Sequence, residues 1–338
     1  MSSEKSNFGY NLKSKIKKIL LWFMGTAFLI LVIYFFLSQN PQAYSQWVRV
    51  QGVNIKSVQC LASTGNAIFA GTDHGILRST DNGLSWSPLD SNRLSFTSVN
   101  AILIDGNDMY AGTYNAGVLR STNGGTSWFA AREGQGTRIF SLAIIGSSLF
   151  AGTNRGVRRT TDCGRTWQDA SSGVNADIRA LAVVGNTLLA CCNGAVLRST
   201  NKGISWSRVD KNLQQLNKLP TTIVSRDTQI FVGSGDGVFR STDYGINWTS
   251  ISTGISLEKF QPYAPIHNCV TALDVSGNFF LAGTYGGDGV FRSVDNGATW
   301  SQFNDGLENL VSTVTCFLVS EQRIFLGTKG QGCYVRTF

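Results

Sequence analysis

Short apolar runs alternate with polar turns along the chain after about residue 46, and the alternation returns every 40 or so residues. Each repeat holds one apolar run such as SVNAILI, a second that ends in Gly-Thr such as MYAGT, and a third such as GVLR. Short apolar runs bounded by turn residues are typical of β-strands. With the residues that follow a Trp, each repeat predicts four antiparallel strands, and this period is typical of propeller blades.

An eight-residue motif follows the third predicted strand of a repeat and ends in Trp. Its six copies are 79–86 (STDNGLSW), 121–128 (STNGGTSW), 160–167 (TTDCGRTW), 199–206 (STNKGISW), 241–248 (STDYGINW) and 293–300 (SVDNGATW). Asp and Asn accept backbone N–H groups in tight turns, and Gly supplies positive φ. We therefore interpret the acidic or amide residue of each copy as structural: Asp81, Asn123, Asp162, Asn201, Asp243 and Asp295. We call these six segments the box turns.

The number of repeats predicts seven blades. The last repeat reaches residue 338 without a box turn, whereas Trp47 opens the region as a Trp strand with no repeat before it. Of the eight tryptophans, Trp22 lies in an apolar segment and the other seven supply one per blade. We expect residues 45–338 to form an all-β, seven-bladed β-propeller that is closed non-covalently by its amino-terminal strand, which leaves no open sheet edge.

Residues 19–37 form an uncharged apolar stretch of 19 residues. As a helix this stretch spans about 28 Å, close to the thickness of the bilayer core, and it predicts a transmembrane anchor. Lysines crowd residues 1–18, which predicts a basic cytoplasmic amino terminus, with a linker at 38–44 and an extracytoplasmic (periplasmic, lumenal or extracellular) propeller. The alternative is a cleaved signal peptide and a secreted propeller.

The formal charge of +8 does not indicate nucleic-acid binding. Residues 1–18 hold five lysines and one glutamate, so half of the excess belongs to the flank of the apolar stretch. No basic helix or aromatic-basic ladder follows, and we expect no nucleic-acid partner. The two histidines and seven scattered cysteines show no metal-ligand spacing, so we predict neither a metal site nor a cofactor.

The motif S-x-D-x-G-x-[ST]-W resembles the Asp-box, or bacterial neuraminidase repeat (BNR), of the sialidase-like superfamily, over about residues 45–338. Sialidases have six blades and an Arg-Ile-Pro element, for which this chain offers only Arg138-Ile139-Phe140, and sortilin-type receptors have ten blades. Seven blades are nearer to the photosystem II assembly factor-like and xyloglucanase-like propellers. The resemblance to the assembly factors implies a protein-binding platform on a membrane, and the resemblance to the hydrolases implies a glycoside hydrolase.

Strand order predicts that the turns after the Gly-Thr pairs and the links between blades share one face, where propellers usually bind ligands. We predict a protein- or carbohydrate-binding module there, with contacts at His74, Tyr114, Asn115, Arg138, Arg155, Arg179, Tyr285 and Lys329. The long link at 253–268 adds Glu258, Lys259, Tyr263 and His267. The alternative is a sialidase-like or xyloglucanase-like glycoside hydrolase that uses two carboxylates among Asp236, Asp288 and Asp73, since glycosidases need a pair of carboxyl groups.

Overall fold

The structure is a computed structural model of the chain, and its described part belongs to one compact unit, Tyr44–Phe338. The described residues are 46–50, 56–89, 97–131, 136–192, 194–210, 213, 220–255, 269–276, 279–285, 288–307, 313–320 and 322–337. Within these ranges no helix has the length and apolar character needed to span a membrane. The predicted anchor at 19–37, and Glu258, Lys259, Tyr263 and His267 of the long link, lie outside the described residues.

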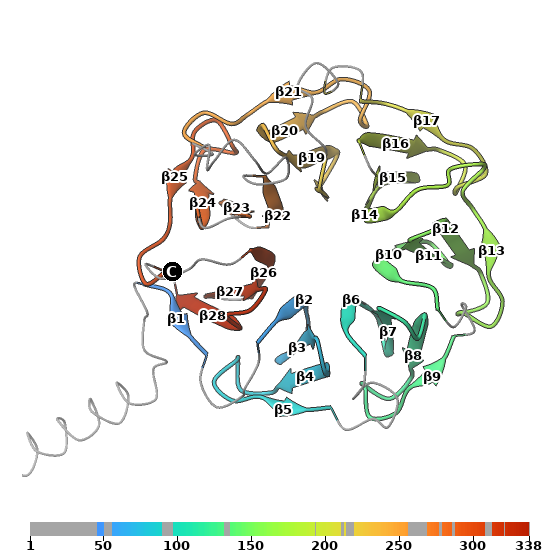
Figure 1. Ribbon diagram of the computed structural model, residues 1–338, viewed down its shortest axis with the longest axis horizontal. Helices are drawn as coiled ribbons and strands as arrows, with labels where there is room; N and C mark the ends of the chain where they lie inside the picture. Colours follow the sequence, from blue (N-terminus) through green and yellow to red (C-terminus); the bar gives the residue numbers. More distant parts are fainter. Residues whose placement is uncertain are drawn as a thin grey trace, which may run out of the picture. The chain divides into compact units, whose positions relative to one another are not determined.

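Seven antiparallel four-stranded sheets stand side by side in a ring, as Figure 1 shows. Sequential strands pair within each sheet, so every blade is a meander that starts at the centre of the ring and ends at its outer wall. The predicted all-β, seven-bladed propeller is therefore confirmed. We number the blades 1 to 7 from β2–β5 to the sheet of β26, β27, β28 and β1.

The strands occupy four equivalent positions in each blade. The inner strands are β2 (Val58–Thr64), β6 (Val99–Asp105), β10 (Ile139–Ile145), β14 (Ile178–Val184), β18 (Thr222–Arg226), β22 (Val270–Asp274) and β26 (Val314–Ser320). The second strands are β3 (Ala67–Thr72), β7 (Asp108–Thr113), β11 (Ser148–Thr153), β15 (Thr187–Cys192), β19 (Gln229–Ser234), β23 (Phe280–Thr284) and β27 (Arg323–Thr328). The third strands are β4 (Gly75–Ser79), β8 (Val118–Ser121), β12 (Gly156–Thr160), β16 (Ala195–Ser199), β20 (Gly237–Ser241), β24 (Val290–Ser293) and β28 (Cys333–Thr337). The outer strands are β5 (Ser87–Pro88), β9 (Phe129–Ala130), β13 (Gln168–Asp169), β17 (Ser207–Arg208), β21 (Thr249–Ser250), β25 (Ser301–Gln302) and β1 (Val48–Arg49).

The amino-terminal strand β1 completes blade 7, as the sequence predicted. It pairs antiparallel with β28, with Val48 opposite Val335. Trp47 is 2% exposed, and its indole N–H donates to the Phe303 carbonyl of blade 6 at 2.7 Å. Trp167, Trp206, Trp248 and Trp300 make the same bond to the preceding blade, for example from Trp300 to the Ile251 carbonyl at 2.6 Å, whereas Trp86 and Trp128 donate to Gly83 and Gly125 of their own box turns. Non-covalent closure of the ring therefore repeats the contact that joins blades 2 to 6.

The hydrophobic core lies between neighbouring blades. The Phe231 ring of blade 5 meets the Phe280 ring of blade 6 edge to face at 5.0 Å, and the Phe325 ring of blade 7 meets Trp86 of blade 1 at 6.4 Å. The alternation of the strands sends apolar side chains to both faces of each sheet, so each sheet is buried from both sides. This arrangement explains why the repeat holds apolar residues on successive positions rather than on one face only.

The box turns close on themselves through hydrogen bonds. The Asp295 carboxylate accepts the Ser293 hydroxyl at 2.7 Å and the Thr299 amide and hydroxyl at 2.8 and 2.5 Å. These bonds, led by the Thr299 hydroxyl, lower the pKa of Asp295 to about 2. Gly83 has a φ of 81°, and a Cβ there would lie 2.3 Å from the Phe325 ring. Turn geometry and contact with the neighbouring blade therefore both require glycine.

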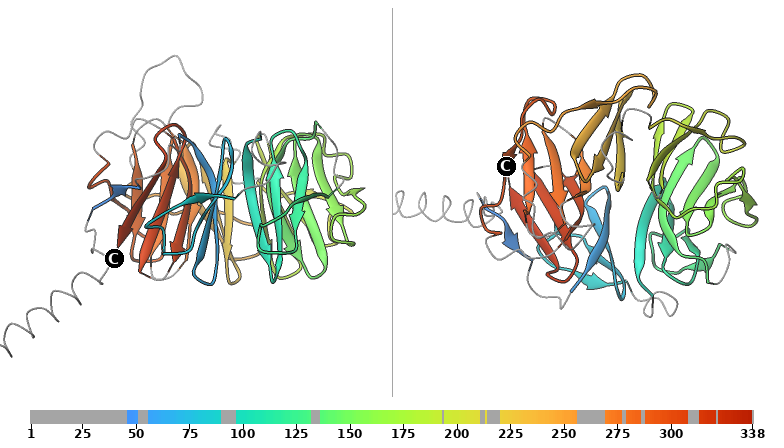
Figure 2. Two further views of the ribbon diagram at one scale, coloured as in Figure 1. Left: turned by 90° about the horizontal axis from the view of Figure 1, so that it is seen from below. Right: turned by 45° about the horizontal axis from the view of Figure 1, so that its top comes forward.

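The propeller has two faces with different connections. Because strands alternate in direction, the turns between second and third strands share one face with the links between blades, and we call it the loop face. The box turns and the turns between first and second strands share the opposite face, which we call the box face. In the left view of Figure 2 the two sets of connections lie at opposite ends of the strands.

Candidate functional site

On the loop face, the turn after the Gly-Thr pair is hydrogen-bonded to the start of the inner strand of its own blade in blades 2, 3, 6 and 7. The backbone N–H of Tyr114 donates to the Ser98 carbonyl at 2.9 Å, and that of Asn154 donates to the Arg138 carbonyl at 3.1 Å. The Tyr285 and Lys329 amides make the same bond in blades 6 and 7. Side chains from these turns are therefore carried on a fixed backbone beside the central opening.

The inner strands share a β-bulge at the loop face in blades 1 to 4, 6 and 7. The side chain at the bulge position usually reaches the next blade. In blade 6 the Thr271 hydroxyl donates to the Val314 carbonyl at 2.6 Å, and in blade 2 the Asn100 amide donates to the Ile139 carbonyl at 2.8 Å. The hydroxyls of Thr221 and Thr315 make the equivalent bonds from blades 5 and 7. At this position a polar side chain thus joins neighbouring blades around the opening.

Blades 3 and 4 depart from this pattern, with Phe140 and Arg179 at the bulge position. Instead of an interblade hydrogen bond, these residues form a stack with their neighbours. The Arg138 guanidinium carbon lies 4.0 Å from the centre of the Tyr114 ring and 5.9 Å from that of the Phe140 ring. The Arg179 guanidinium carbon also lies 5.9 Å from the centre of the Phe140 ring. An Arg138 N–H also donates to the Tyr114 hydroxyl. We call Tyr114, Arg138, Phe140 and Arg179 the rim cluster.

The rim cluster holds two permanent positive charges at the solvent boundary. Tyr114 is 48% exposed, and the Arg179 side chain is 56% exposed with a terminal nitrogen 3.8 Å from the Asp177 carboxylate. Each guanidinium has five N–H donors in a planar fork that matches a carboxylate or phosphate. Stacking on an aromatic ring is worth about 0.5–1 kcal/mol at exposed sites and orients the guanidinium. The arrangement can therefore bind an anionic group and stack against a planar or apolar one.

The other predicted contact residues that the structure describes lie on the same face, but no contact described joins them to the cluster. Asn115 accepts a hydrogen bond from the Thr97 hydroxyl at 2.6 Å, and Arg155 and Lys329 are exposed. The His74 imidazole lies 3.9 Å from the Asp73 carboxylate. Tyr285 is half-buried in blade 6. The sequence alone did not select Phe140 as a contact residue, because only the structure shows that its ring contacts two guanidinium groups.

The three candidate catalytic acids are on the second-to-third strand turns of blades 1, 5 and 6. The backbone N–H of Asp236 donates a hydrogen bond to the Ser234 hydroxyl at 3.1 Å. The backbone carbonyl of Asp288 accepts a hydrogen bond from the Asn304 side-chain amide at 3.0 Å. All three acids are half-buried. These bonds use the backbone to shape the turns, and the use of a carboxylate pair for hydrolysis stays a prediction.

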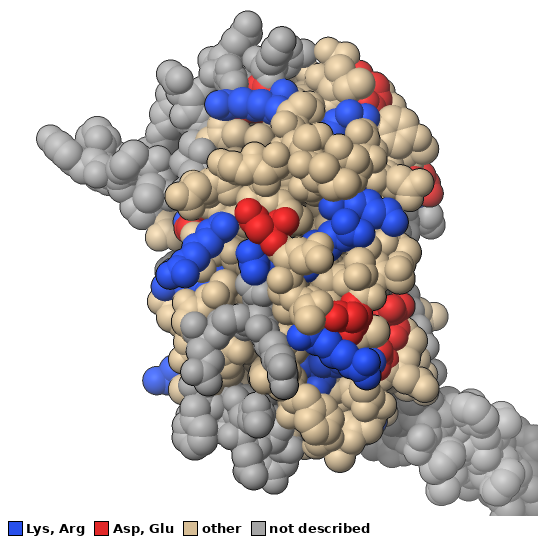
Figure 3. All heavy atoms as spheres, turned by 90° about the vertical axis from the view of Figure 1, so that its right-hand side faces the viewer, with Lys and Arg blue, Asp and Glu red and all other residues tan. Residues whose placement is uncertain are grey.

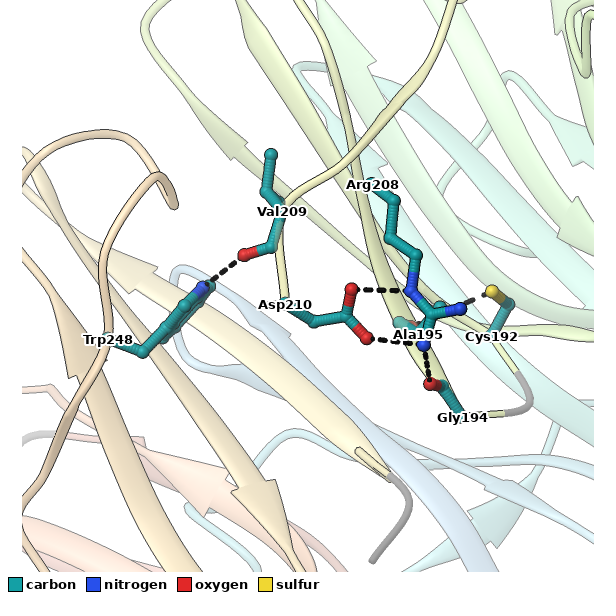
Figure 4. Close-up of polar contacts among 7 residues, drawn as sticks. All are labelled: Cys192, Gly194, Ala195, Arg208, Val209, Asp210 and Trp248. Carbon is teal, nitrogen blue, oxygen red and sulfur yellow. Dashed lines mark hydrogen bonds and ion pairs between the residues drawn. The ribbon is translucent and has the colours of Figure 1, made fainter. Parts of the chain in front are cut away.

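An ion pair that sequence reasoning missed fixes the loop-face end of blade 4. Arg208 donates to both oxygens of the Asp210 carboxylate at 2.6 and 2.9 Å, and to the Gly194 carbonyl at 2.8 Å. Figure 4 shows this pair beside Cys192, with the Trp248 indole of blade 5 donating to the Val209 carbonyl at 2.8 Å. Asp210 is 2% exposed. Because Arg208 and Asp210 are two residues apart on one strand end, their pairing could have been suspected from the sequence Arg-Val-Asp.

Charge on the outer wall is mixed. Figure 3 views the side that carries β13, where Lys and Arg side chains lie among Asp and Glu side chains. In the part of the chain that the structure describes, no three His, Cys, Asp or Glu side chains gather as metal ligands would. What distinguishes the rim cluster is its stacked geometry.

With the blades and the rim cluster defined, the chain can be compared with known proteins. No protein-family model matches the sequence. A curated relative, the oligoxyloglucan-reducing end-specific xyloglucanase of Emericella nidulans, is 29% identical over 123 residues, which are 34% of this chain and 15% of that enzyme. The chain therefore spans a small part of that relative's length.

Solved structures with the same architecture cover most of the chain. YCF48 bound to a D1 peptide is 17% identical with a TM-score of 0.65, over 87% of this chain and 97% of that one. The extracellular domain of a putative one-component system of B. thetaiotaomicron is 16% identical with a TM-score of 0.70, over 87% and 40%. The GH74 xyloglucanase of Xanthomonas campestris is 18% identical with a TM-score of 0.68, over 86% and 53%. The likeness is one of fold.

Proposed function

We propose that this chain is a membrane-anchored, extracytoplasmic binding module whose loop face holds a protein or glycan partner through a carboxylate group at the rim cluster. The observation that carries the proposal is the stacking of Arg138 between Tyr114 and Phe140, with Arg179 on the same ring. The six box turns and their internal hydrogen bonds support membership of the Asp-box propellers.

The geometry favours recognition of a carboxylate. Only one Arg138 N–H is taken by the Tyr114 hydroxyl among the bonds described, so the guanidinium keeps further donors for a ligand. Charge-assisted hydrogen bonds of this kind contribute about 1.5–3 kcal/mol each. One of the neighbours in fold, YCF48, is described as bound to a peptide, which supports a peptide as the carrier of the carboxylate.

The anchor and the location rest on the amino-terminal sequence. Residues 19–37 are uncharged and apolar, and the lysines before them favour a cytoplasmic amino terminus, which leaves the propeller outside the cytoplasm. A propeller of similar fold is described as an extracellular domain, which supports the same side. Secretion after signal cleavage is the alternative.

Binding of fluorescent peptides with a free or an amidated carboxyl terminus, and of uronic acid-containing and neutral oligosaccharides, tests the proposal. We expect binding only to probes with a carboxylate, and at least tenfold weaker binding by Arg138→Ala. The matched control is Arg165→Ala, which removes an exposed arginine from the same blade on the box face. Equal binding of free and amidated peptides and of neutral sugars, or equal effects of the two substitutions, would contradict the proposal.

A glycoside hydrolase is the second candidate, because the curated relative that matches part of the chain is a xyloglucanase. Asp236 and Asp288 lie on adjacent blades of the loop face and are the pair to test. We expect Asp236→Asn and Asp288→Asn each to abolish release of oligosaccharides from xyloglucan if the chain is a hydrolase. Under the first proposal the unmodified chain releases none.

A further inference from the structure

Exposed large apolar side chains gather in the box turns. Of the seven such side chains in the described part of the chain, five lie in these turns. They are Leu84 (58% exposed), Ile204 (70%), Tyr244 (40%), Ile246 (57%) and Val294 (66%). The other two are Tyr114 of the rim cluster and Phe129 on β9. Among the described residues, the box face therefore exposes more large apolar side chains than the loop face does, and grouped exposed apolar residues mark a contact surface.

The apolar box turns occupy one arc of the ring. They belong to blades 1, 4, 5 and 6, whereas the box turns of blades 2 and 3 present residues such as Thr126 and Arg165. Blade 7 stands between blades 6 and 1 and is completed by β1. Leu84 and Val294 thus lie in the two blades that flank the place where the amino-terminal chain joins the propeller.

The amino-terminal chain joins the propeller at the box face. The third strand of each blade runs from the loop face to the box face, and β28 is the third strand of blade 7. Because β1 is antiparallel to β28, it starts at the box face, and Gln46 precedes it there. Figure 2 marks the carboxyl-terminal end, which follows β28, at the same end of the blades.

The distance to a membrane is limited by the linker. Only residues 38–45 separate the predicted span from Gln46, and a fully extended chain of this length reaches about 28 Å. We infer that the box face lies on the membrane and that the apolar tips of blades 1, 4, 5 and 6 enter the lipid interface, so that the rim cluster points away from the bilayer. This inference rests on the proposed membrane anchor.

A lipid surface fits the chemistry of these tips. Each is an apolar side chain on a turn whose Asp or Asn already makes hydrogen bonds within the turn, as in blade 5, where Asp243 accepts hydrogen bonds from the Asn247 backbone and side-chain amides at 2.9 and 2.7 Å. Isolated apolar side chains that project from a polar turn can enter the interface while the turn stays hydrated, as on interfacial helices. Tyr244 also suits the interface, because its ring is apolar and its hydroxyl is polar.

Fluorescence quenching with the full chain in phosphatidylcholine vesicles tests the orientation. In a Cys163→Ser background, which removes the exposed cysteine, a fluorophore is attached to the Thr242→Cys variant on the box face or to the Asn115→Cys variant on the loop face. Nitroxide-labelled phosphatidylcholine is the quencher. We expect at least threefold stronger quenching at position 242 than at position 115.

A triple substitution tests the apolar tips themselves. Ile204→Ser, Ile246→Ser and Val294→Ser together are expected to lower quenching at position 242 by at least half. Phe129→Ser is the matched control, because it removes a side chain of 59% exposure from the outer wall rather than from the box face. We expect this control to leave the quenching unchanged.

The possible failures are distinguishable. If the chain floats with the vesicles but position 115 is quenched as strongly as position 242, the orientation is overturned and the anchor stands. If the chain does not float, the proposed anchor fails and the inference fails with it. If the triple substitution abolishes a concentration-dependent dimer in detergent without changing quenching by lipid, the apolar tips contact a second copy and the inference is overturned.

Discussion

The bulge position at the central opening is used in two ways on the two sides of the ring. In blades 6 and 7 it holds a threonine, and Thr221 takes the equivalent place in blade 5; each hydroxyl donates to the next blade, as Thr271 does to the Val314 carbonyl at 2.6 Å. In blades 3 and 4 it holds Phe140, whose ring contacts Arg138, and Arg179, which contacts the same ring. The same backbone site therefore joins neighbouring blades on one side of the ring and presents side chains to solvent on the other. This difference separates the residues that keep the ring closed from those that are available to a ligand.

The largest expected effect comes from removing the contact between blades 7 and 6 at the strand that closes the ring. Trp47→Ala removes a ring that is 2% exposed and lies 5.7 Å from Phe303, together with the bond to the Phe303 carbonyl. Truncation of a buried aromatic residue costs about 3–5 kcal/mol, so we expect the free energy of unfolding in urea to fall by that amount. Phe129→Ala, on an exposed ring, is the control and should change it by less than about 0.5 kcal/mol. A loss below about 1 kcal/mol for Trp47→Ala would show that β1 does not close the ring.

A smaller loss is expected from a single interblade bond. Thr271→Val keeps the shape of the side chain but removes the donor to the Val314 carbonyl, which then lacks this partner. We expect a loss of about 1–2 kcal/mol in denaturant unfolding. Thr271→Ser keeps the hydroxyl and should retain most of that stability. If the serine and valine variants were equally destabilised, the methyl group rather than the hydrogen bond would be the important contact.

Replacing Phe140 of blade 3 with threonine, the residue at the equivalent position of blades 5 to 7, should separate the effect on stability from the effect on binding. Phe140→Thr places a hydroxyl where the carbonyl of Ile178, the equivalent of Val314, is the acceptor, and removes the ring between Arg138 and Arg179. We expect the free energy of unfolding to change by less than about 1 kcal/mol, because a hydrogen bond replaces a half-buried ring. Binding of a carboxylate probe should weaken by about threefold or more, because Arg138 and Arg179 both lose their cation–π contact with this ring. Unchanged binding would remove Phe140 from the site.

The smallest effect is on the pH dependence of stability, and it involves a box turn rather than the central opening. The pKa of Asp295, about 2 in the folded chain, lies below its ordinary value of 3.8. Its stabilising contribution is therefore complete above about pH 4 and is lost as the pH falls towards 2. Asp295→Asn should show a flatter loss of unfolding free energy over this range than the unmodified chain. The box turns at Asn123 and Asn201 already carry an amide, which donates to Ser127 and Ser205, and a further Asn-to-Ser change there should not alter the pH dependence. If Asp295→Asn and the unmodified chain lost stability in the same way as the pH falls, the lowered pKa of Asp295 would not contribute to stability.

The architecture could be predicted from the sequence because its determinants are local and repeated. The spacing of Gly-Thr pairs, box turns and tryptophans gave seven blades, and the unmatched Trp47 predicted the closing strand. The interblade bonds could not be predicted in this way, since Thr271 and Val314 are far apart in sequence and neither residue type identifies the other as its partner. For the same reason Tyr114, Arg138 and Arg179 were chosen one by one as candidates, whereas their stacking around Phe140 depends on the positions of three different blades.

Closure by β1 has a mechanical consequence. Any pull on the chain before Gln46 reaches the propeller through β1, which is held by two ladder pairs to β28, by the Trp47 amide on the Asp305 carbonyl and by its indole on Phe303. Because the pull comes from the box face and follows the strand axis, it shears these bonds together rather than peeling them one at a time. Force on the proposed anchor would thus be delivered to the pairing of β1 with β28, where the ring has no covalent continuity, and the ring would open there first.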